Sequence, residues 1–118
     1  MYNAYILERT MDEYNSLKTE LSQAEFVLEK EKDDEDIMVM VDYGRVDAFA
    51  DIVQKHLNEP FNYVDCQFPE QGLTVLIFLN KMVTIDNEQT NQKVKQWALS
   101  IGLSEKEADW PTSYSYGA

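Results

Sequence analysis

The stretch Leu73-Thr-Val-Leu-Ile-Phe-Leu79 decides how the rest of this chain is interpreted. It has no charge and is rich in strong β-formers, and Pro69-Glu-Gln-Gly72 interrupts the chain just before it. A strand that is apolar on both alternating faces belongs in the middle of a sheet that is covered on both sides. We therefore expect the other elements to pack around this strand.

Length and charge limit the kind of protein and the kind of partner. The 118 residues fit a single domain, and a hydrophobic content of 44% argues against wholesale disorder. There are 22 acids and 10 bases, which gives a net charge of −12. Such a surface repels phosphate groups, so we expect no direct binding to nucleic acid and no docking on anionic membranes. A protein partner with a basic surface is favoured instead.

Cysteine content and the N-terminus predict the compartment and the absence of cofactors. With one cysteine, the chain can form neither an internal disulfide nor a cysteine-based zinc site. Residues 1–9 lack the basic and apolar regions of a signal peptide, and no apolar run reaches the roughly 20 residues that span a bilayer. We expect a cytoplasmic monomer or homodimer with no metal and no cofactor.

The N-terminal 36 residues allow two interpretations. Apolar residues on a heptad seam favour one long helix: Leu7, Tyr14, Leu17, Leu21, Ala24 and Leu28. The alternative is a shorter helix over Met11–Gln23, begun by the capping-box pattern Thr10-Met-Asp-Glu13, with strands at Tyr2–Leu7 and Glu25–Glu31. We favour the helix over Met11–Gln23 and leave both flanks open. The acidic run Glu29–Asp36 that follows is expected to be a solvated connector.

From Ile37 onward the patterns alternate between strands and helices. Strands are predicted at Ile37–Tyr43, Phe61–Phe68 and Leu73–Leu79, and the last two are joined by a four-residue hairpin connection. Helices are predicted at Val46–Leu57 and Asn87–Ile101, the second with an Asp86 N-cap and Gly102 just after its end. The aromatic tail, residues 108–116, is expected to pair with the sheet or to pack on it.

This order predicts an α+β protein with a ferredoxin-like βαββαβ sheet over about residues 37–116, preceded by an N-terminal helix. The whole chain, 1–118, then forms one domain, with an N-terminal segment at 1–36 and a ferredoxin-like body at 37–118. In that topology Ile37–Tyr43 and Leu73–Leu79 are the central pair. Two helices would cover only one face of the sheet, so we expect the N-terminal helix or a second copy of the protein to cover the other.

Residues that could carry catalysis are few and lack partners in the sequence. His56 is the single histidine and is expected on a helix flank or at the surface. Cys66 is expected to be a small buried hydrophobe, and Met38 and Met40 are expected to belong to the core. A small enzyme or ligand-binding domain that uses Asp42, Asp65 and His56 is the alternative hypothesis.

The C-terminal sequence Ala108-Asp-Trp-Pro-Thr-Ser-Tyr114 resembles one known family. Together with an N-terminal helix, an acidic connector and a βαββαβ body, it is similar to the ribonuclease E inhibitor (regulator of ribonuclease activity B) family. The shared residues are Asp109, Trp110, Thr112 and Tyr114. This chain has Pro111 after the Trp, no Gly before it, and no long acidic tail. The resemblance implies a small acidic protein that regulates a ribonuclease.

Our leading hypothesis is a non-enzymatic, acidic protein-binding regulator or inhibitor. Antitoxins, immunity proteins and phage inhibitors belong to the same class. Residues 1–36 hold 11 acids and 4 bases, a net of −7, so more than half of the excess charge lies in under a third of the chain. The candidate partner-binding residues are in the acidic run and the aromatic tail: Asp33, Asp34, Glu35, Asp36, Trp110 and Tyr114.

Overall fold

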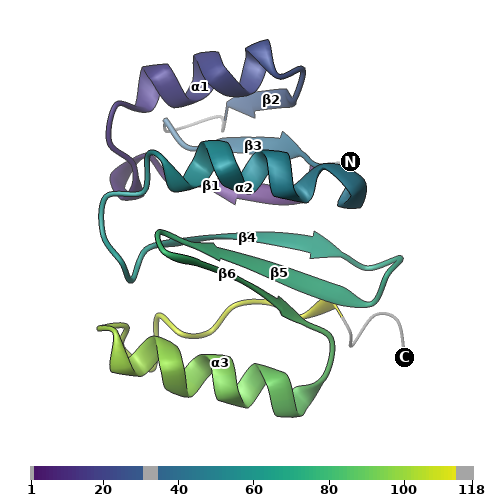
Figure 1. The fold of residues 1–118 in the computed structure, drawn as a ribbon, viewed down its shortest axis with the longest axis vertical. Coiled ribbons are helices and arrows are strands. Elements are labelled where there is room, and N and C mark those ends of the chain that lie inside the picture. Colours follow the sequence, from purple (N-terminus) through teal and green to yellow (C-terminus); the bar gives the residue numbers. More distant parts are fainter. Residues whose placement is uncertain (1, 31–34, 114–118) are drawn as a thin grey trace.

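Six strands form one antiparallel sheet in the computed structural model, which describes residues 2–30 and 35–113 (Figure 1). The strands are β1 (Ala4–Ile6), β2 (Val27–Lys30), β3 (Ile37–Met40), β4 (Tyr63–Phe68), β5 (Leu73–Phe78) and β6 (Lys81–Ile85). The described residues also form the helices α1 (Tyr14–Gln23), α2 (Val46–Gln54) and α3 (Glu88–Ser100), with 3₁₀ turns at Glu8–Thr10 and Tyr43–Arg45. The predicted α+β class is confirmed.

The strand order is β2-β3-β1-β4-β5-β6, which differs from the predicted ferredoxin-like body at 37–116. That prediction made β3 and β5 neighbours, and it is wrong because β1 and β4 lie between them. The prediction started the sheet at Ile37 and left the N-terminal strands open, whereas the three-residue strand β1 pairs with both β3 and β4. Strand β6, at the sheet edge, was not predicted. A βαββαβ order does occur, but over residues 4–68, where β3 lies between β1 and β2 as in a split βαβ unit.

The N-terminal segment adopts the strand–helix–strand alternative, and the single long helix is wrong. Helix α1 ends because Glu25 takes the left-handed conformation, with φ +67°, and the Phe26 amide donates to the Leu21 carbonyl 3.0 Å away. This is a Schellman-type ending, and the buried Phe26 supplies its hydrophobic contact. The predicted capping box is not formed, because Thr10 Oγ1 donates to the Leu7 carbonyl and α1 begins only at Tyr14.

Helices α1 and α2 cover the same face of the sheet, which we name the first face. Each is a crossover between two parallel strands, since β1 and β2 are both antiparallel to β3, and β3 and β4 are both antiparallel to β1. Right-handed crossovers place both helices on one side. The main core lies beneath them and is built from buried apolar side chains of both layers, among them Ile6, Leu17, Leu21, Val39, Phe49, Val53, Cys66 and Ile77.

Helix α3 and residues 103–113 cover part of the opposite face, which we name the second face. Leu76 and Phe78 of β5 pack there against Val94 and Ala98 of α3 and against Trp110. The prediction that the N-terminal helix covers the face opposite the other two helices is wrong, because α1 shares the first face with α2. The expected tail packing is confirmed as far as Ser113, whose amide donates to Thr74 Oγ1 over 2.8 Å. Figure 1 shows α3 at the opposite end of the molecule from α1 and β2.

The ends of α3 lie within one residue of the predicted ones. The N-cap is Asn87 and not Asp86, because Asn87 Oδ1 accepts the Thr90 amide at 2.8 Å. Gly102 follows the helix with φ +119°, and a Cβ there would meet the Phe61 ring at 3.3 Å. The hairpin connection Pro69–Gly72 is confirmed, with Phe68 directly opposite Leu73.

Candidate functional site

One row of residues crosses the whole second face and divides it into a covered and an uncovered half. Directly paired residues make up this row: Glu29, Met38, Tyr5, Asp65, Leu76 and Val83. Leu76 is fully buried under α3 and residues 103–113, whereas Met38 and Tyr5 are only half-buried. In the neighbouring pair Val27 and Met40, the side chains are 51% and 37% exposed.

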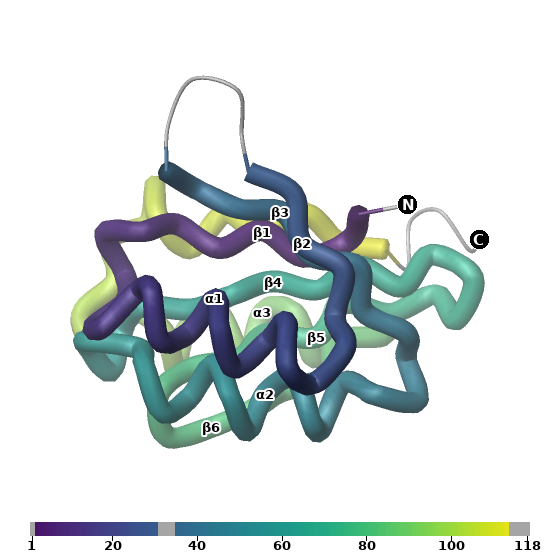
Figure 2. Tube along the Cα trace, turned by 90° about the horizontal axis from the view of Figure 1, so that it is seen from above, coloured from purple at the N-terminus to yellow at the C-terminus, as the bar shows by residue number. Residues whose placement is uncertain are grey.

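We call the uncovered half the open face and define it by the outward side chains of β1 to β4. They are Tyr5, Val27, Glu29, Met38, Met40, Asp65 and Gln67. Met38 and Met40 were predicted to be core residues, and this is wrong for Met40. The alternation of β3 points Ile37 and Val39 into the core beneath α1 and α2, so the methionines face the side that α3 does not reach. Figure 2, which is seen from above, shows the path of the chain through β2, β3 and β1, with α1 and α2 on one side of these strands.

Two adjoining cavities form a groove on and beside the open face. The first, of about 260 Å³, is lined by Tyr2, Asn3, Ala4, Tyr5, Met38, Asp65, Gln67 and Pro69. The second, of about 500 Å³, is lined by Asn3, Gln67, Pro69, Met40 and Phe68, by residues 41–44 and by Glu70 and Gln71. We call the two together the Met groove. Among the described residues, the charged side chains that line it are Asp42, Asp65 and Glu70, with no Lys or Arg.

Asn3 holds the floor of the Met groove in place at the point where β1 begins. Its Nδ2 donates to the carbonyls of Val41, at 2.9 Å, and Gln67, at 3.1 Å, and its Oδ1 accepts the Val41 amide at 2.8 Å. The Asn3 side chain thus links the backbone just after β3 to the backbone of β4. Three hydrogen bonds of one side chain therefore fix the floor of the groove, while residues 41–44 and the turn at residues 69–71 form part of its walls.

Asp65 lies where the Met groove meets a third cavity, and its carboxylate is partly desolvated. Burial raises the pKa of Asp65 above its ordinary value, although a 2.9 Å hydrogen bond from Gln67 Nε2 acts in the opposite direction. The carboxylate is therefore held on the sheet at some cost in stability. At the other end of the open face, in β2, Glu29 accepts a hydrogen bond from the Tyr2 hydroxyl, which raises the pKa of Tyr2.

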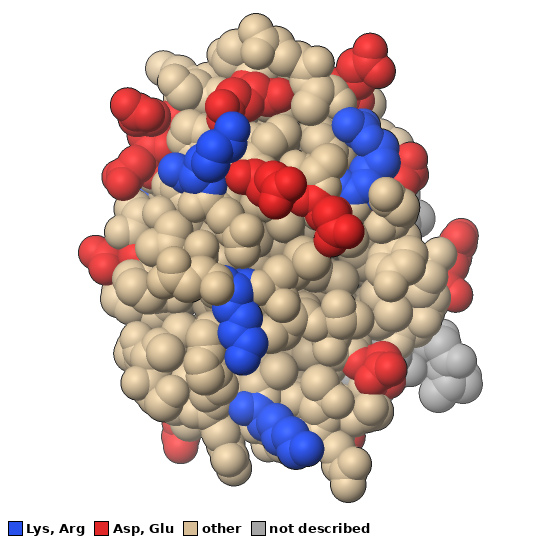
Figure 3. Space-filling model, viewed as in Figure 1, with Lys and Arg blue, Asp and Glu red and all other residues tan. Residues whose placement is uncertain are grey.

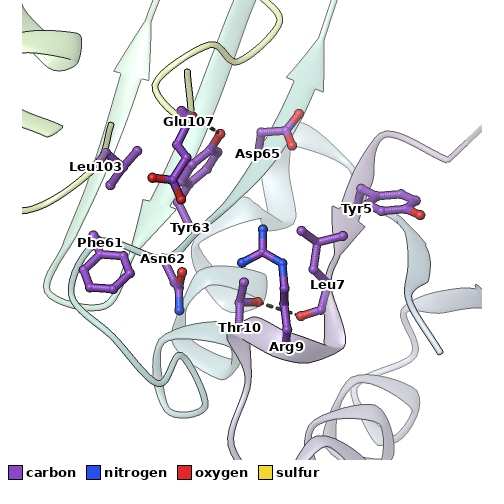
Figure 4. Close-up of a pocket in the computed structure, with 10 residues that line it drawn as sticks. All are labelled: Tyr5, Leu7, Arg9, Thr10, Phe61, Asn62, Tyr63, Asp65, Leu103 and Glu107. Atoms are coloured by element: carbon purple, nitrogen blue, oxygen red, sulfur yellow. Dashed lines mark hydrogen bonds between the residues drawn. The ribbon is translucent and has the colours of Figure 1, made fainter. Parts of the chain in front are cut away.

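The third cavity, of about 170 Å³, combines one cation with two acids (Figure 4). Arg9 extends into it toward Asn62 and Asp65, and Glu107 lies on the far side, above Tyr63. Burial raises the pKa of Tyr63 to about 12, with further contributions from Asp65 and other charges, so this phenol stays neutral at physiological pH. Its hydroxyl donates to the Glu107 carbonyl at 3.2 Å. Ser104 holds the pKa of the Glu107 carboxyl below its ordinary value by donating from its amide and hydroxyl.

The predicted partner-binding residues are scattered. Asp33, Asp34 and Tyr114 lie outside the described residues. Glu35 is exposed and forms an ion pair with Lys30 at 2.7 Å, and Asp36 Oδ1 accepts the Glu8 amide at 2.8 Å. Trp110 is not a surface residue: it is 4% exposed, and its Nε1 donates to Asn91 Oδ1 at 2.8 Å. Its role in the described structure is to cover the second face.

The alternative constellation of Asp42, Asp65 and His56 is not assembled. Asp42 follows β3 and Asp65 lies in β4, and β1 lies between these two strands. His56 is buried, not at the surface, and both its ring nitrogens are engaged: Nε2 lies 2.6 Å from Glu20 Oε2, and Nδ1 lies 3.0 Å from the Asp12 carbonyl. Histidine therefore ties α1 to the end of α2.

Other chemistry is limited in the part of the chain that the structure describes. Cys66 is fully buried, as expected, and burial raises the pKa of its thiol far above the ordinary value. No group of three or more His, Cys, Asp or Glu side chains within residues 2–30 and 35–113 is placed to hold a metal ion. None of the helices in these ranges has the length and apolarity needed to cross a bilayer. Comparison with protein-family models, curated proteins and solved structures gives no match.

The open face could have been found only in part from the sequence. The signal is the strand Ile37-Met-Val-Met40, which places two methionines on one face and two β-branched residues on the other. Methionine is common at adaptable binding surfaces as well as in cores. What the sequence did not reveal is that α3 stops short of β3, and this is what leaves the methionines uncovered.

Proposed function

We propose that this protein is a non-enzymatic, acidic binding module that regulates or inhibits a protein partner with a basic surface. The observation that carries the proposal is the open face: half of one sheet face bears Met, Tyr and Val side chains under no described element. Exposed apolar areas with polar rims commonly mark protein–protein contacts. The rim here is acidic, which selects against acidic partners.

Charge supports a basic protein partner over the other classes. A net charge of −12 accelerates encounters with cations and repels phosphate-bearing surfaces. Figure 3 has the same view as Figure 1. At the α1 end of the surface in view, acidic and basic side chains are intermixed. The Met groove differs, because its charged lining residues are all acids. A localised acidic groove gives a partner's cations a defined place to bind.

The similarity to the ribonuclease E inhibitor family would make the partner a ribonuclease, and this belongs to the proposal. The element order that contributed to that similarity is not the observed one. Of the residues shared with that family, the structure describes Asp109, Trp110 and Thr112, and Trp110 is a core residue. Antitoxin, immunity and phage-inhibitor roles need the same physical features, an acidic surface and a protein-binding face.

A small-ligand function is the second candidate, and the cavity around Arg9 is the observation that favours it. Arg9 could bind a carboxylate, while Asp65 and Glu107 could bind an ammonium group. A thermal-shift screen with metabolites and metal ions tests this directly. A ligand at about 100 times its dissociation constant adds about 2.7 kcal/mol to the free energy of unfolding.

Capture of the physiological partner, followed by kinetics, tests the proposed function. The tagged protein is used to isolate partners from its source cells, and the association rate of each purified partner is measured from about 50 to about 300 mM NaCl. We expect a basic protein whose association slows steeply as salt is added. An acidic partner, or a rate that salt does not change, would contradict the proposal.

A further inference from the structure

The Met groove has the chemistry of a receptor for a particular kind of side-chain pair. Its apolar lining is concentrated in Met38 and Met40 of β3, with Tyr5 beside Met38 in β1. Its acids are spread along it: Asp65 lies at one end, and Asp42 and Glu70 lie in the other cavity. Unbranched methionine side chains adapt to the shape of an apolar partner, whereas the carboxylates require a cation.

The partial burial of the Asp65 carboxylate also favours a cationic ligand. Its carboxylate lies between the half-buried Tyr5 and the fully buried Leu76, directly paired with both. Its hydrogen-bond donors among the described residues are Gln67 Nε2, at 2.9 Å, and the backbone amide of Asp65 itself, and both are neutral. Arg9 extends toward Asp65 from the third cavity, and a cation from a partner would add charge compensation from the Met groove, where no described base lies. A residue that disfavours folding and faces a cavity is a candidate for function.

We propose that the Met groove binds a segment of the partner that carries a Lys or Arg within two residues of a large apolar side chain. The apolar side chain lies on Met38 and Met40, and the cation lies against Asp65 or Asp42. This inference rests on the proposed function and adds to it the docking surface and the chemistry of the docked segment. Charge complementarity selects this occupant, since the groove holds three acids and no base.

A second copy of this chain fits the groove less well. Each copy carries a charge of −12, so an interface centred on the groove would bring acids against acids. Val27, in the edge strand β2, is paired with the groove residue Met40 and continues the same apolar surface to the edge of the sheet. A basic and apolar segment matches both parts of this surface at once.

Blocked peptides test the inference with the full-length protein. The probe is Gly-Leu-Lys-Leu-Lys-Gly, and the comparison peptides are Gly-Leu-Glu-Leu-Glu-Gly and Gly-Ser-Lys-Ser-Lys-Gly. Binding is followed by the amide chemical shifts of the ¹⁵N-labelled protein. We expect the first peptide alone to shift the amides of Met38, Met40, Asp42 and Gln67 in a saturable way, with α3 unaffected. Equal binding of the Glu peptide, shifts confined to another surface, or no binding at millimolar peptide would overturn the inference.

Matched variants locate the contact. Replacing both Met38 and Met40 by Gln should weaken binding about fivefold, because partly buried apolar area is lost. Met82→Gln is the control, since Met82 is 36% exposed, almost the same as Met40, but lies in β6 at the other edge of the sheet. Asp42→Asn with Asp65→Asn should weaken binding about tenfold at low salt. Wild-type affinity in the Met38 and Met40 double variant would overturn the inference.

Two further outcomes separate this inference from the proposed function and from self-association. If the captured partner binds the Met38 and Met40 double variant as tightly as the wild type, with steep salt dependence, the proposed function stands and the groove inference fails. If the same amides shift with protein concentration when no peptide is present, a second copy occupies the groove, and the inference is again overturned. Sedimentation velocity on the same samples measures that association.

Discussion

The two halves of the second face have similar strand chemistry and different outcomes. In β5, Leu76 and Phe78 alternate with Val75 and Ile77, and all four side chains are buried. In β3, Met38 and Met40 alternate with Ile37 and Val39, yet only the latter pair is buried. The difference lies in the cover that each strand receives, because α3 comes after β6 and, with residues 103–113, reaches β4, β5 and β6 only. Strand apolarity therefore predicts burial only where the chain provides a cover.

Handedness explains why only one helix was available for the second face. The crossovers β1-α1-β2 and β3-α2-β4 each join parallel strands, so both helices fall on the first face. Helix α3 is not part of such a crossover in the described structure, and it folds onto the opposite side. One helix and the segment after it cannot cover six strands, and the β2-β3-β1 end is left open.

The largest effect on stability is expected when an aspartate is introduced into the covered half of the second face, and the same change in the open face is the comparison. Leu76→Asp should abolish folding, because an unpaired buried charge costs several kcal/mol against a total stability of about 5–15 kcal/mol. Met40→Asp should change the free energy of unfolding by less than about 1 kcal/mol, because this side chain is already partly hydrated. Urea unfolding followed by circular dichroism measures both. If Met40→Asp also prevents folding, the open face is covered by something that the described residues do not include.

A smaller effect is expected from the hydrogen bond that fixes the cover of the closed half. Asn91→Ala leaves the buried Nε1 of Trp110 without its acceptor, which should lower the free energy of unfolding by about 1–3 kcal/mol. Gln96→Ala is the control, since Gln96 is an exposed position of the same helix and should change stability by less than about 0.5 kcal/mol. Equal melting of the two variants would show that Trp110 does not depend on this bond.

The sequence revealed the elements better than their arrangement. The strands around Val75 and Val39, and the helices over Val46–Gln54 and Glu88–Ser100, were recognisable because their periodicity is strong. The strand Ala4–Ile6 appeared only as one of two open alternatives, at Tyr2–Leu7, because three residues carry little periodicity, and its central place in the sheet was not predicted. Its position depends on pairing with residues more than 30 positions away, such as Val39 and Cys66. No local pattern encodes such a pairing.

The candidate site shows the same limit. Asp65 is recognisable from the sequence as an acid in a strand, but its significance comes from Tyr5 and Met38 in the same row, which only the strand order brings together. Trp110 was assigned to partner binding, although the tail that carries it was also expected to pack on the sheet, and its indole completes the core. His56 was expected on a helix flank or at the surface; it follows the end of α2 and is buried, with ring contacts to Asp12 and Glu20. The sequence did not predict how deeply the side chains of Trp110 and His56 are buried.

The pH dependence of stability tests the environment of Asp65, and the expected change in the free energy of unfolding is smaller than for Asn91→Ala. Because burial raises its pKa in the folded protein, the folded state binds more protons than the unfolded state between the ordinary and the raised values. Wild-type stability should therefore fall as pH rises through that window, and the deficit should persist at neutral pH. Asp65→Asn should be more stable than wild type at pH 7, by less than about 1 kcal/mol, and the advantage should vanish at low pH. Thermal melts from acid to neutral pH measure this difference, and a variant that is less stable at pH 7 would show that the carboxylate stabilises the sheet.

The smallest effect on stability, and a separate effect on binding, is expected in the acidic connector. Replacing Asp33, Asp34, Glu35 and Asp36 by Ser and Asn should leave the melting temperature nearly unchanged, because the ion pair between Glu35 and Lys30 joins two side chains that are each more than half exposed. It removes four of the 22 acids, so association with the captured partner should slow and its salt dependence should flatten. Dissociation should stay close to the wild-type rate, since the Met groove is intact. If the variant associates as fast as wild type with the same salt slope, the connector is only a solvated link, and the acids of the open face are sufficient for attraction. If dissociation accelerates strongly, the connector itself contacts the partner, and binding is not confined to the groove.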